Sequence, residues 1–265
     1  MARANKNKEA AIGSQNRTVS PNEAKSALTH CIKLQRPIMM WGAPGIGKSD
    51  IVKQIADLEG REVVDIRLPL WEPTDIKGIP YYNAKENNMV WASPAELPTD
   101  PKSNAIVFLD ELNSAAPAVQ AAAYQLILNR RVGQYHLPKD VSIVAAGNRD
   151  SDKGVTYRMP APLANRFVHV ELRVDFEDWM EWATTNHIHP DVVGYCTFAK
   201  QDLYDFNPRG SSRSFATPRS WSFVSQLLSD DLPESTLTDL VAGCVGEGLA
   251  VKFMNHRKIS GQLPN

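Results

Sequence analysis

Residues 42–49 read Gly42-Ala43-Pro44-Gly45-Ile46-Gly47-Lys48-Ser49. This octapeptide fits the pattern G-x-x-x-x-G-K-[ST], in which a glycine-rich turn leads into a helix. Glycines let the backbone approach an anion closely, so that its N–H groups can point at phosphate oxygens. A chain of this length would show such a match by chance only about once in a hundred cases. The stretch therefore predicts a phosphate-binding loop, and all eight of its residues are candidate nucleotide contacts.

The residues on either side of this loop support the prediction. Residues 37–41 form a short apolar run typical of a buried strand, and residues 49–58 carry apolar side chains at helical spacing. A strand, a glycine loop and a helix in this order place the phosphate at a helix N-terminus, where backbone N–H groups lack partners. We expect Lys48 to reach the β and γ phosphates of ATP and the Ser49 hydroxyl to bind Mg²⁺.

Two polar positions follow other buried strands. The apolar residues 105–109 lead into Asp110 and Glu111, and residues 141–146, which also read as a buried strand, lead into Gly147 and Asn148. Asp110 is expected to contact Mg²⁺, directly or through water, while Glu111 activates the attacking water. Asn148 could orient that water or touch the γ-phosphate, although an ordinary turn would also explain an asparagine there. These residues predict an ATPase.

The rest of the chain divides into two parts by its pattern. Further strands are predicted at residues 63–66 and 167–172, and helices at residues 20–34 and 116–130, which indicates a doubly wound α/β fold with a parallel sheet. Beyond Val174 the strand signals disappear, and residues 176–186, 190–200, 218–229 and 235–255 have helical spacing. We therefore expect an α/β core over residues 18–174 and a small all-α domain over residues 175–265.

The composition limits the cellular compartment and the classes of partner that we expect for the chain. The 265 residues are 43% hydrophobic and 22% charged with a formal net charge of −1, so no global basic field attracts nucleic acid. Three scattered cysteines favour a reducing compartment, and no apolar run approaches the roughly 18 residues that span a membrane. The polar residues 1–17 predict a disordered tail more than a signal peptide. We expect a cytoplasmic protein without membrane contact.

Three stretches outside the phosphate loop resemble the MoxR-like branch of the AAA+ ATPases. They are Asp110-Glu111-Leu112-Asn113-Ser114-Ala115-Ala116-Pro117, Glu72-Pro73-Thr74-Asp75-Ile76-Lys77-Gly78 and Leu163-Ala164-Asn165-Arg166-Phe167. The resemblance covers roughly residues 20–230. It implies a P-loop AAA+ core followed by a small helical lid, ATP hydrolysis with Mg²⁺, and assembly into a homo-oligomeric ring, which in this branch is a hexamer. Ser114 stands where the branch usually has arginine, which leaves any subunit contact of that arginine in doubt.

The resemblance also assigns two arginines. Arg166 would be the arginine finger that reaches the γ-phosphate bound by the neighbouring subunit, with Arg158 as a second candidate. Arg219, in Thr217-Pro218-Arg219, would be the sensor-2 arginine of the lid. Taken as residues alone, Arg166 is an ordinary surface charge unless a ring forms. Arg219 falls in the first turn of a predicted helix, where positive charge is unfavourable unless an anion lies nearby.

Two inserts of the core resemble hairpins. Residues 68–100 are long for a simple connection and carry Tyr81-Tyr82 and Met89-Val90-Trp91 around an Asn-rich turn, and residues 131–140 form a shorter candidate. In the MoxR-like branch an insert at the first position faces the ring pore. Its aromatic side chains could grip a polypeptide, or they could pack against their own domain.

The predicted function is an ATP-hydrolysing ring that remodels or activates a protein partner. In the MoxR-like branch that partner commonly bears a von Willebrand A domain. A nucleic-acid motor or loader is the alternative, which the net charge disfavours without excluding nucleic acid. A third interpretation is a nucleotide-gated assembly module without hydrolysis, which the presence of both Asp110 and Glu111 disfavours.

Overall fold

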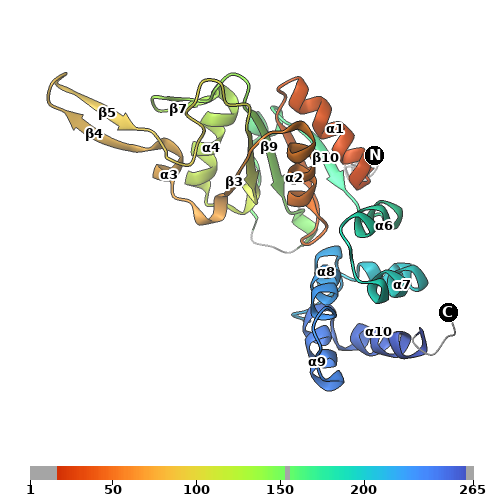
Figure 1. The fold of residues 1–265 in the computed structure, drawn as a ribbon. Helices are drawn as coiled ribbons and strands as arrows, with labels where there is room; N and C mark the ends of the chain where they lie inside the picture. The colour runs from red at the N-terminus through yellow and green to blue at the C-terminus, as the bar shows by residue number, and fades with distance from the viewer. Residues whose placement is uncertain (1–16, 153–155, 261–265) are drawn as a thin grey trace, which may run out of the picture.

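A sheet of six parallel strands forms the centre of the computed structural model (Figure 1). In spatial order the strands are β1 (Thr18–Val19), β10 (Val168–Leu172), β2 (Ile38–Trp41), β9 (Ser142–Gly147), β6 (Ile106–Asp110) and β3 (Val63–Arg67). The central strands β6 and β9 are buried throughout, as expected for a parallel sheet covered on both faces. The predicted doubly wound α/β fold is confirmed. The sequence did not predict β1, because a strand of two residues is too short to show the alternating pattern of a strand.

The structure describes residues 17–152 and 156–260. The predicted disordered tail of residues 1–17 therefore lies outside the described residues, apart from Arg17. Within the described ranges, no helix is long and apolar enough to cross a bilayer.

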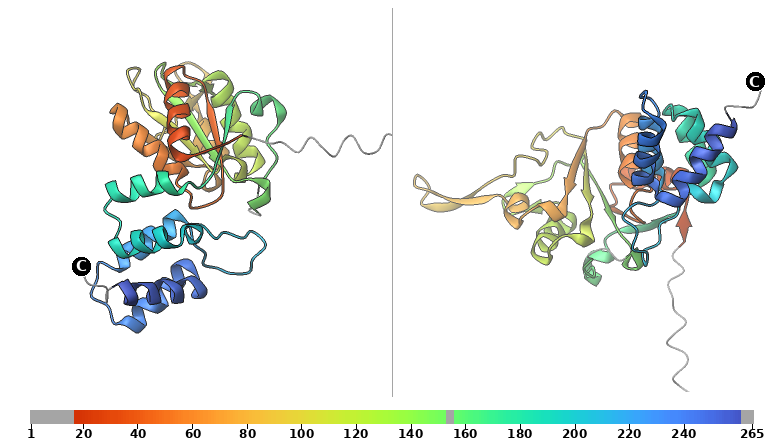
Figure 2. Two further views of the ribbon diagram at one scale, coloured as in Figure 1. Left: turned by 90° about the vertical axis from the view of Figure 1, so that its right-hand side faces the viewer. Right: turned by 90° about the horizontal axis from the view of Figure 1, so that it is seen from below.

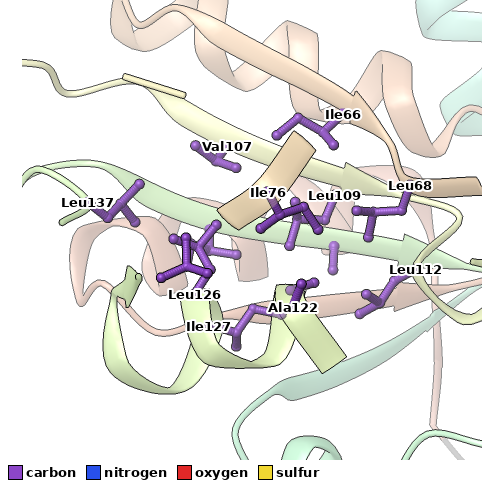
Figure 3. Packing of buried hydrophobic residues seen from close by; sticks show 14 of the residues in the cluster. Ile66, Leu68, Ile76, Val107, Leu109, Leu112, Ala122, Leu126, Ile127 and Leu137 are labelled. Atoms are coloured by element: carbon purple, nitrogen blue, oxygen red, sulfur yellow. The ribbon is translucent and has the colours of Figure 1, made fainter. Parts of the chain in front are cut away.

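Helices cover the two faces of the sheet because side chains alternate along each strand. On one face, α1 (Pro21–Lys33) and α2 (Lys48–Glu59) pack on Ile38 and Met40 of β2. On the other face, α4 (Pro117–Asn129) and α3 (Pro73–Lys77) pack on Met39 of β2 and on Val107 and Leu109 of β6 (Figure 3). The predicted capping box of α1 is present, with Ser20 as N-cap and Glu23 as its partner.

Short elements connect these layers. They are η1 (Leu68–Leu70) after β3, η2 (Leu112–Ser114) after β6, η3 (Asp150–Asp152) after β9, and α5 (Ala161–Ala164) before β10. The helices and turns that follow strands β2, β6 and β9 all begin at the same edge of the sheet, the edge formed by the carboxyl ends of the strands.

Both predicted hairpins are present. The first, β4 (Ile79–Asn83) with β5 (Asn88–Ala92), projects well away from the body of the molecule (Figures 1 and 2). The second, β7 (Arg131–Val132) with β8 (Tyr135–His136), supports its base, because the Gln134 side chain accepts a hydrogen bond from the Trp91 N–H at 3.1 Å. Tyr81 and Tyr82 are 50% and 59% exposed. Each of these two tyrosines therefore leaves half or more of its surface open to solvent.

The described residues 176–260 of the C-terminal region form helices joined by loops, without a strand. It contains α6 (Phe176–Thr185), α7 (Pro190–Phe198), η4 (Lys200–Leu203), α8 (Pro218–Leu227), α9 (Glu234–Val245) and α10 (Glu247–Ser260). These helices enclose a core of their own, built around Trp179, Tyr195, Trp221 and Phe253. The prediction of one helical segment over residues 235–255 is wrong, because Gly246 adopts a φ of +95° and ends α9.

Candidate nucleotide-binding site

The phosphate-binding loop (residues 42–49) leaves β2 at the carboxyl edge of the sheet and enters α2. The Gly42 N–H donates to the Gly147 carbonyl at 3.2 Å, which ties the start of the loop to the end of β9. Gly45 and Gly47 have φ values of +75° and +93°, a region that glycine enters without steric cost. Gly47 is the N-cap of α2 and provides no side-chain cap. The first N–H groups of α2 are thus available to an anion.

Lys48 is held inside this loop by neutral oxygens. Its Nζ donates to the Gly42 carbonyl at 2.6 Å, to the Ala43 carbonyl at 2.9 Å and to Asn148 Oδ1 at 3.4 Å. Burial lowers the pKa of the ammonium from 10.5 to about 8, with partial opposition from the charge of Asp110. A buried cation whose charge is only partly compensated is stabilised further by a bound anion. The loop therefore fits the phosphates of a nucleotide.

Ser49 and Asp110 meet across the carboxyl edge of the sheet. The Ser49 hydroxyl donates to Asp110 Oδ2 at 3.3 Å, and the other carboxylate oxygen of Asp110 accepts the Glu111 N–H at 2.9 Å. A hydroxyl and a carboxylate are hard oxygen ligands, and Mg²⁺ commonly takes just one or two carboxylates beside substrate phosphates and water. In residues 17–152 and 156–260 no group of three or more His, Cys, Asp or Glu forms a metal site. The pair thus fits a magnesium ion carried mainly by a nucleotide.

Glu111 has an unusual backbone conformation. Its φ of +55° and ψ of +36° lie in the left-handed region, where a residue with a Cβ is strained. This conformation turns the chain sharply at the end of β6, where η2 begins. Strained backbone of this kind concentrates at functional sites, and Glu111 is half-buried next to Asp110.

Asn148 is fixed by a residue that the sequence did not single out for a role. The Nδ2 of Asn113 donates to the Asn148 carbonyl at 2.8 Å, and its Oδ1 accepts the Asn148 N–H at 3.2 Å. The Asn113 side chain is buried, and a Cβ at Gly147 would come within 2.5 Å of its Oδ1. The backbone of Asn148 is therefore pinned while its own amide faces Lys48.

The sequence also did not indicate a role for Arg149. Its side chain reaches from the end of β9 across β2 to β10. Its guanidinium pairs with Asp152 at 3.0 Å and with Glu171 at 3.2 Å. Because Glu171 belongs to β10, and β2 lies between β10 and β9, the arginine side chain crosses the end of the strand that carries the phosphate loop. Its position immediately after Asn148 was the available signal, but a charged residue after a strand is too common to be informative.

The N-terminus of α8 rests on the phosphate-binding loop. The Arg219 N–H donates to the Gly45 carbonyl at 3.2 Å, and a Cβ at Gly45 would lie 2.7 Å from the Thr217 hydroxyl. Thr217 is the N-cap of α8 and Pro218 its first residue, as predicted. The Arg219 side chain is exposed, and its charge contributes to the lowered pKa of Lys48. This arginine is thus close enough to the loop to sense an anion there.

Arg166 lies at the amino edge of the sheet, the edge formed by the amino ends of the strands. It precedes β10, where the Val168 N–H donates to the Pro37 carbonyl at 2.9 Å and Val168 pairs with Ile38, the first residue of β2. The phosphate-binding loop starts after the last residue of β2, and four strand residues extend about 13 Å. Arg166 and Arg158 are both exposed. The structure therefore does not bring Arg166 to the phosphate-binding loop of its own chain.

A family comparison agrees with this geometry. Residues 37–167, from the start of β2 to the start of β10, match the family "AAA domain (dynein-related subfamily)". These residues have the P-loop AAA+ fold. The match spans the phosphate-binding loop, the Asp110–Glu111 turn and Asn148, and it ends at Phe167.

Individual relatives of the AAA+ domain are distant. Midasin of Giardia intestinalis is 29% identical over 186 residues, which cover 66% of this chain and 4% of midasin. The chain thus matches a small part of a much longer protein. RuvB of Thermotoga maritima, a Holliday junction branch migration motor, is 18% identical with a TM-score of 0.48 over 89% of this chain and 67% of RuvB. A provisionally named ATPase of Cytophaga hutchinsonii is 18% identical with a TM-score of 0.45 over 84% of this chain and 62% of that one.

Proposed function

We propose that the chain is a magnesium-dependent, MoxR-like AAA+ ATPase that works as a ring, a hexamer by resemblance to that branch, and remodels a protein partner. One observation carries the proposal. Lys48, Asp110 and Asn148 converge on the carboxyl edge of the sheet, whereas Arg166 lies at the amino edge. Each chain would therefore hold most of an ATPase site and offer the missing cation to a neighbour.

The proposed hydrolysis uses the residues around the loop in distinct roles. The N–H groups at the start of α2 and the Lys48 ammonium bind the phosphates, and the N-terminus of α2 adds its positive dipole end. When bound, Mg²⁺ would be held by Ser49 and Asp110 and would neutralise negative charge on the phosphates. The Glu111 carboxylate accepts a proton from the attacking water, while the Asn148 amide orients that water towards the γ-phosphorus.

The position of Arg166 supports the proposed ring. A head-to-tail contact between identical chains brings the amino edge of one sheet to the carboxyl edge of the next and closes if the rotation per chain divides the circle. In that arrangement Arg166 neutralises the charge that develops on the neighbour's γ-phosphate.

The protein-remodelling role is supported by the β4–β5 hairpin. Its exposed Ile79, Tyr81, Tyr82 and Met89 place apolar and aromatic side chains on both faces of a hairpin that projects from the molecule (Figure 1). Large exposed apolar surfaces of this kind mark contacts with other proteins more than contacts with phosphate backbones. By resemblance to the MoxR-like branch, the partner bears a von Willebrand A domain.

The three free cysteines fit a reducing compartment, and we place the protein in the cytoplasm.

Phosphate release tests the proposed activity directly. The purified chain should release phosphate from ATP in the presence of Mg²⁺ and stop when the metal is chelated. Single-stranded and double-stranded DNA are added in parallel, because a nucleic-acid motor would be stimulated by DNA in a manner that weakens steeply with salt. Absence of phosphate release in all arms, under conditions where ATP binds, would overturn hydrolysis. Stimulation by DNA would overturn the protein-remodelling role.

Arg219→Ala is expected to weaken the response of the helical region to the nucleotide. The backbone of Arg219 already contacts Gly45, and in the proposed mechanism its side chain binds the γ-phosphate and draws α8 towards the loop. Distances between labels on α2 and α10, measured with and without a non-hydrolysable ATP analogue, report this response. Arg213→Ala, which removes an exposed arginine from the connection before α8, is the matched control. An unchanged response in Arg219→Ala would contradict the assignment.

A further inference from the structure

Asn113 joins three segments that the proposed reaction needs. Besides its two side-chain bonds to Asn148, its carbonyl accepts the Tyr157 N–H at 2.7 Å. Asn113 itself lies in η2, two residues after Glu111 and with 1% of its surface exposed. A single buried residue thus connects the turn that carries Glu111, the end of β9 that carries Asn148, and the segment that runs towards Arg166.

The side-chain amide of Asn113 makes the backbone hydrogen bonds that a neighbouring strand would otherwise make. The pairing of β6 with β9 ends at Leu109 and Ala145, because the left-handed Glu111 turns the chain away. Beyond that point the Asn113 amide donates and accepts on the Asn148 backbone as a neighbouring strand would. An asparagine side chain has the donor and acceptor that this geometry requires, and neither aspartate nor leucine has both. Gly147 leaves the space that the amide occupies.

We propose that Asn113 is a positioning residue that sets the separation between the Glu111 carboxylate and the Asn148 amide. The inference rests on the proposed hydrolysis, in which these two groups act on the same water. Glu111 and Asn148 come from different strands, and rotation of either segment would separate them. The two bonds of Asn113 hold both segments in one rigid unit, so the attacking water meets a base and an orienting amide in a fixed arrangement.

Two variants of Asn113 test this role. Asn113→Asp keeps the shape and the acceptor but loses the donor to the Asn148 carbonyl, and Asn113→Leu loses both bonds. Since a misplacement of about 1 Å can lower a rate about 100-fold, kcat should fall by about that factor in either variant. The dissociation constant for an ATP analogue should stay at the parent value, because neither variant touches residues 42–49.

A matched control separates positioning from folding. Gln120 in α4 is also buried, and its Nε2 donates to the Ala115 carbonyl at 2.9 Å, so Gln120→Leu removes a comparable buried amide bond that involves neither Asn148 nor Glu111. Both substitutions are expected to lower Tm, but Gln120→Leu should retain kcat. If Asn113→Leu does not fold, Asn113→Asp carries the test. A parent-like kcat in a folded Asn113 variant would overturn the inference.

A double-mutant cycle tests the route through Asn148. If Asn113 acts by placing the Asn148 amide, Asn113→Asp should add little further loss of kcat in an Asn148→Ala background. Fully additive losses would overturn that route. Failure of the parent to hydrolyse ATP would sink the proposed function and this inference together. Hydrolysis by the parent that is lost in Glu111→Gln and kept in Asn113→Asp would sink the inference alone.

Discussion

Glu111→Gln is expected to bind ATP without hydrolysing it. Glutamine keeps the size of the side chain but cannot accept the proton of the attacking water, and loss of a general base lowers a rate by about 10²–10⁴-fold. The loop that holds the phosphates is untouched, so nucleotide affinity should persist. Phosphate release and equilibrium binding of a fluorescent ATP analogue measure the two effects separately.

Lys48→Ala provides the contrasting result. It removes the cation that the loop carbonyls and Asn148 surround, so the nucleotide itself should be lost. Glu62→Gln is the matched control for Glu111→Gln, because it also removes one negative charge and Glu62 is an exposed residue between α2 and β3. If Glu111→Gln turns over ATP at nearly the parent rate, the assignment of Glu111 as the base is wrong.

Arg166→Ala is expected to reduce hydrolysis by about 10³–10⁵-fold, the usual contribution of an arginine finger, while ATP binding remains. The physical reason is that each proposed site would lose the cation that its neighbour supplies. Parent activity per chain should rise with protein concentration as rings form. Arg36→Ala is the matched control, because Arg36 is also exposed and also lies at the amino edge of the sheet, just before β2.

Mixing two inactive variants gives the sharper form of this experiment. Arg166→Ala chains have an intact loop, and Lys48→Ala chains have an intact arginine, so a mixed ring contains some complete sites. Recovered activity on mixing is expected if Arg166 acts on a neighbour. Normal hydrolysis by Arg166→Ala alone, or a parent rate that does not change when rings dissociate on dilution, would contradict the shared site.

The larger elements of the fold could be predicted because their signals are local. Continuous apolar runs predicted β6 and β9, helical spacing predicted α2 and α4, and the Asn-rich turn predicted the β4–β5 hairpin. The same reasoning failed where structure depends on one residue or on distant partners. Gly246 divides α9 from α10 within a continuous helical pattern, and β1 exists because β10 offers it an edge.

The candidate site was predictable only in part, for a similar reason. Asp110 ends a strand, and Lys48, Ser49 and Asn148 follow strands. The carboxyl ends of parallel strands meet at one edge, so the convergence of these residues could be foreseen. The contact between Asn113 and Asn148 joins residues 35 apart in sequence. The bridge from Arg149 to Glu171 depends on β2 lying between their strands. Neither arrangement can be recognised from the local sequence pattern.

The left-handed backbone of Glu111 sets stability against turnover at one position. A residue with a Cβ in this conformation costs about 1–2 kcal/mol relative to a relaxed backbone, and glycine would avoid that cost. A chain selected for resistance to heat alone would therefore favour glycine here and would lose the carboxylate. The strain is tolerated because the sharp turn after β6 holds an acid beside Asp110. Thermal robustness and the proposed catalytic role of Glu111 thus impose opposite demands on a single side chain.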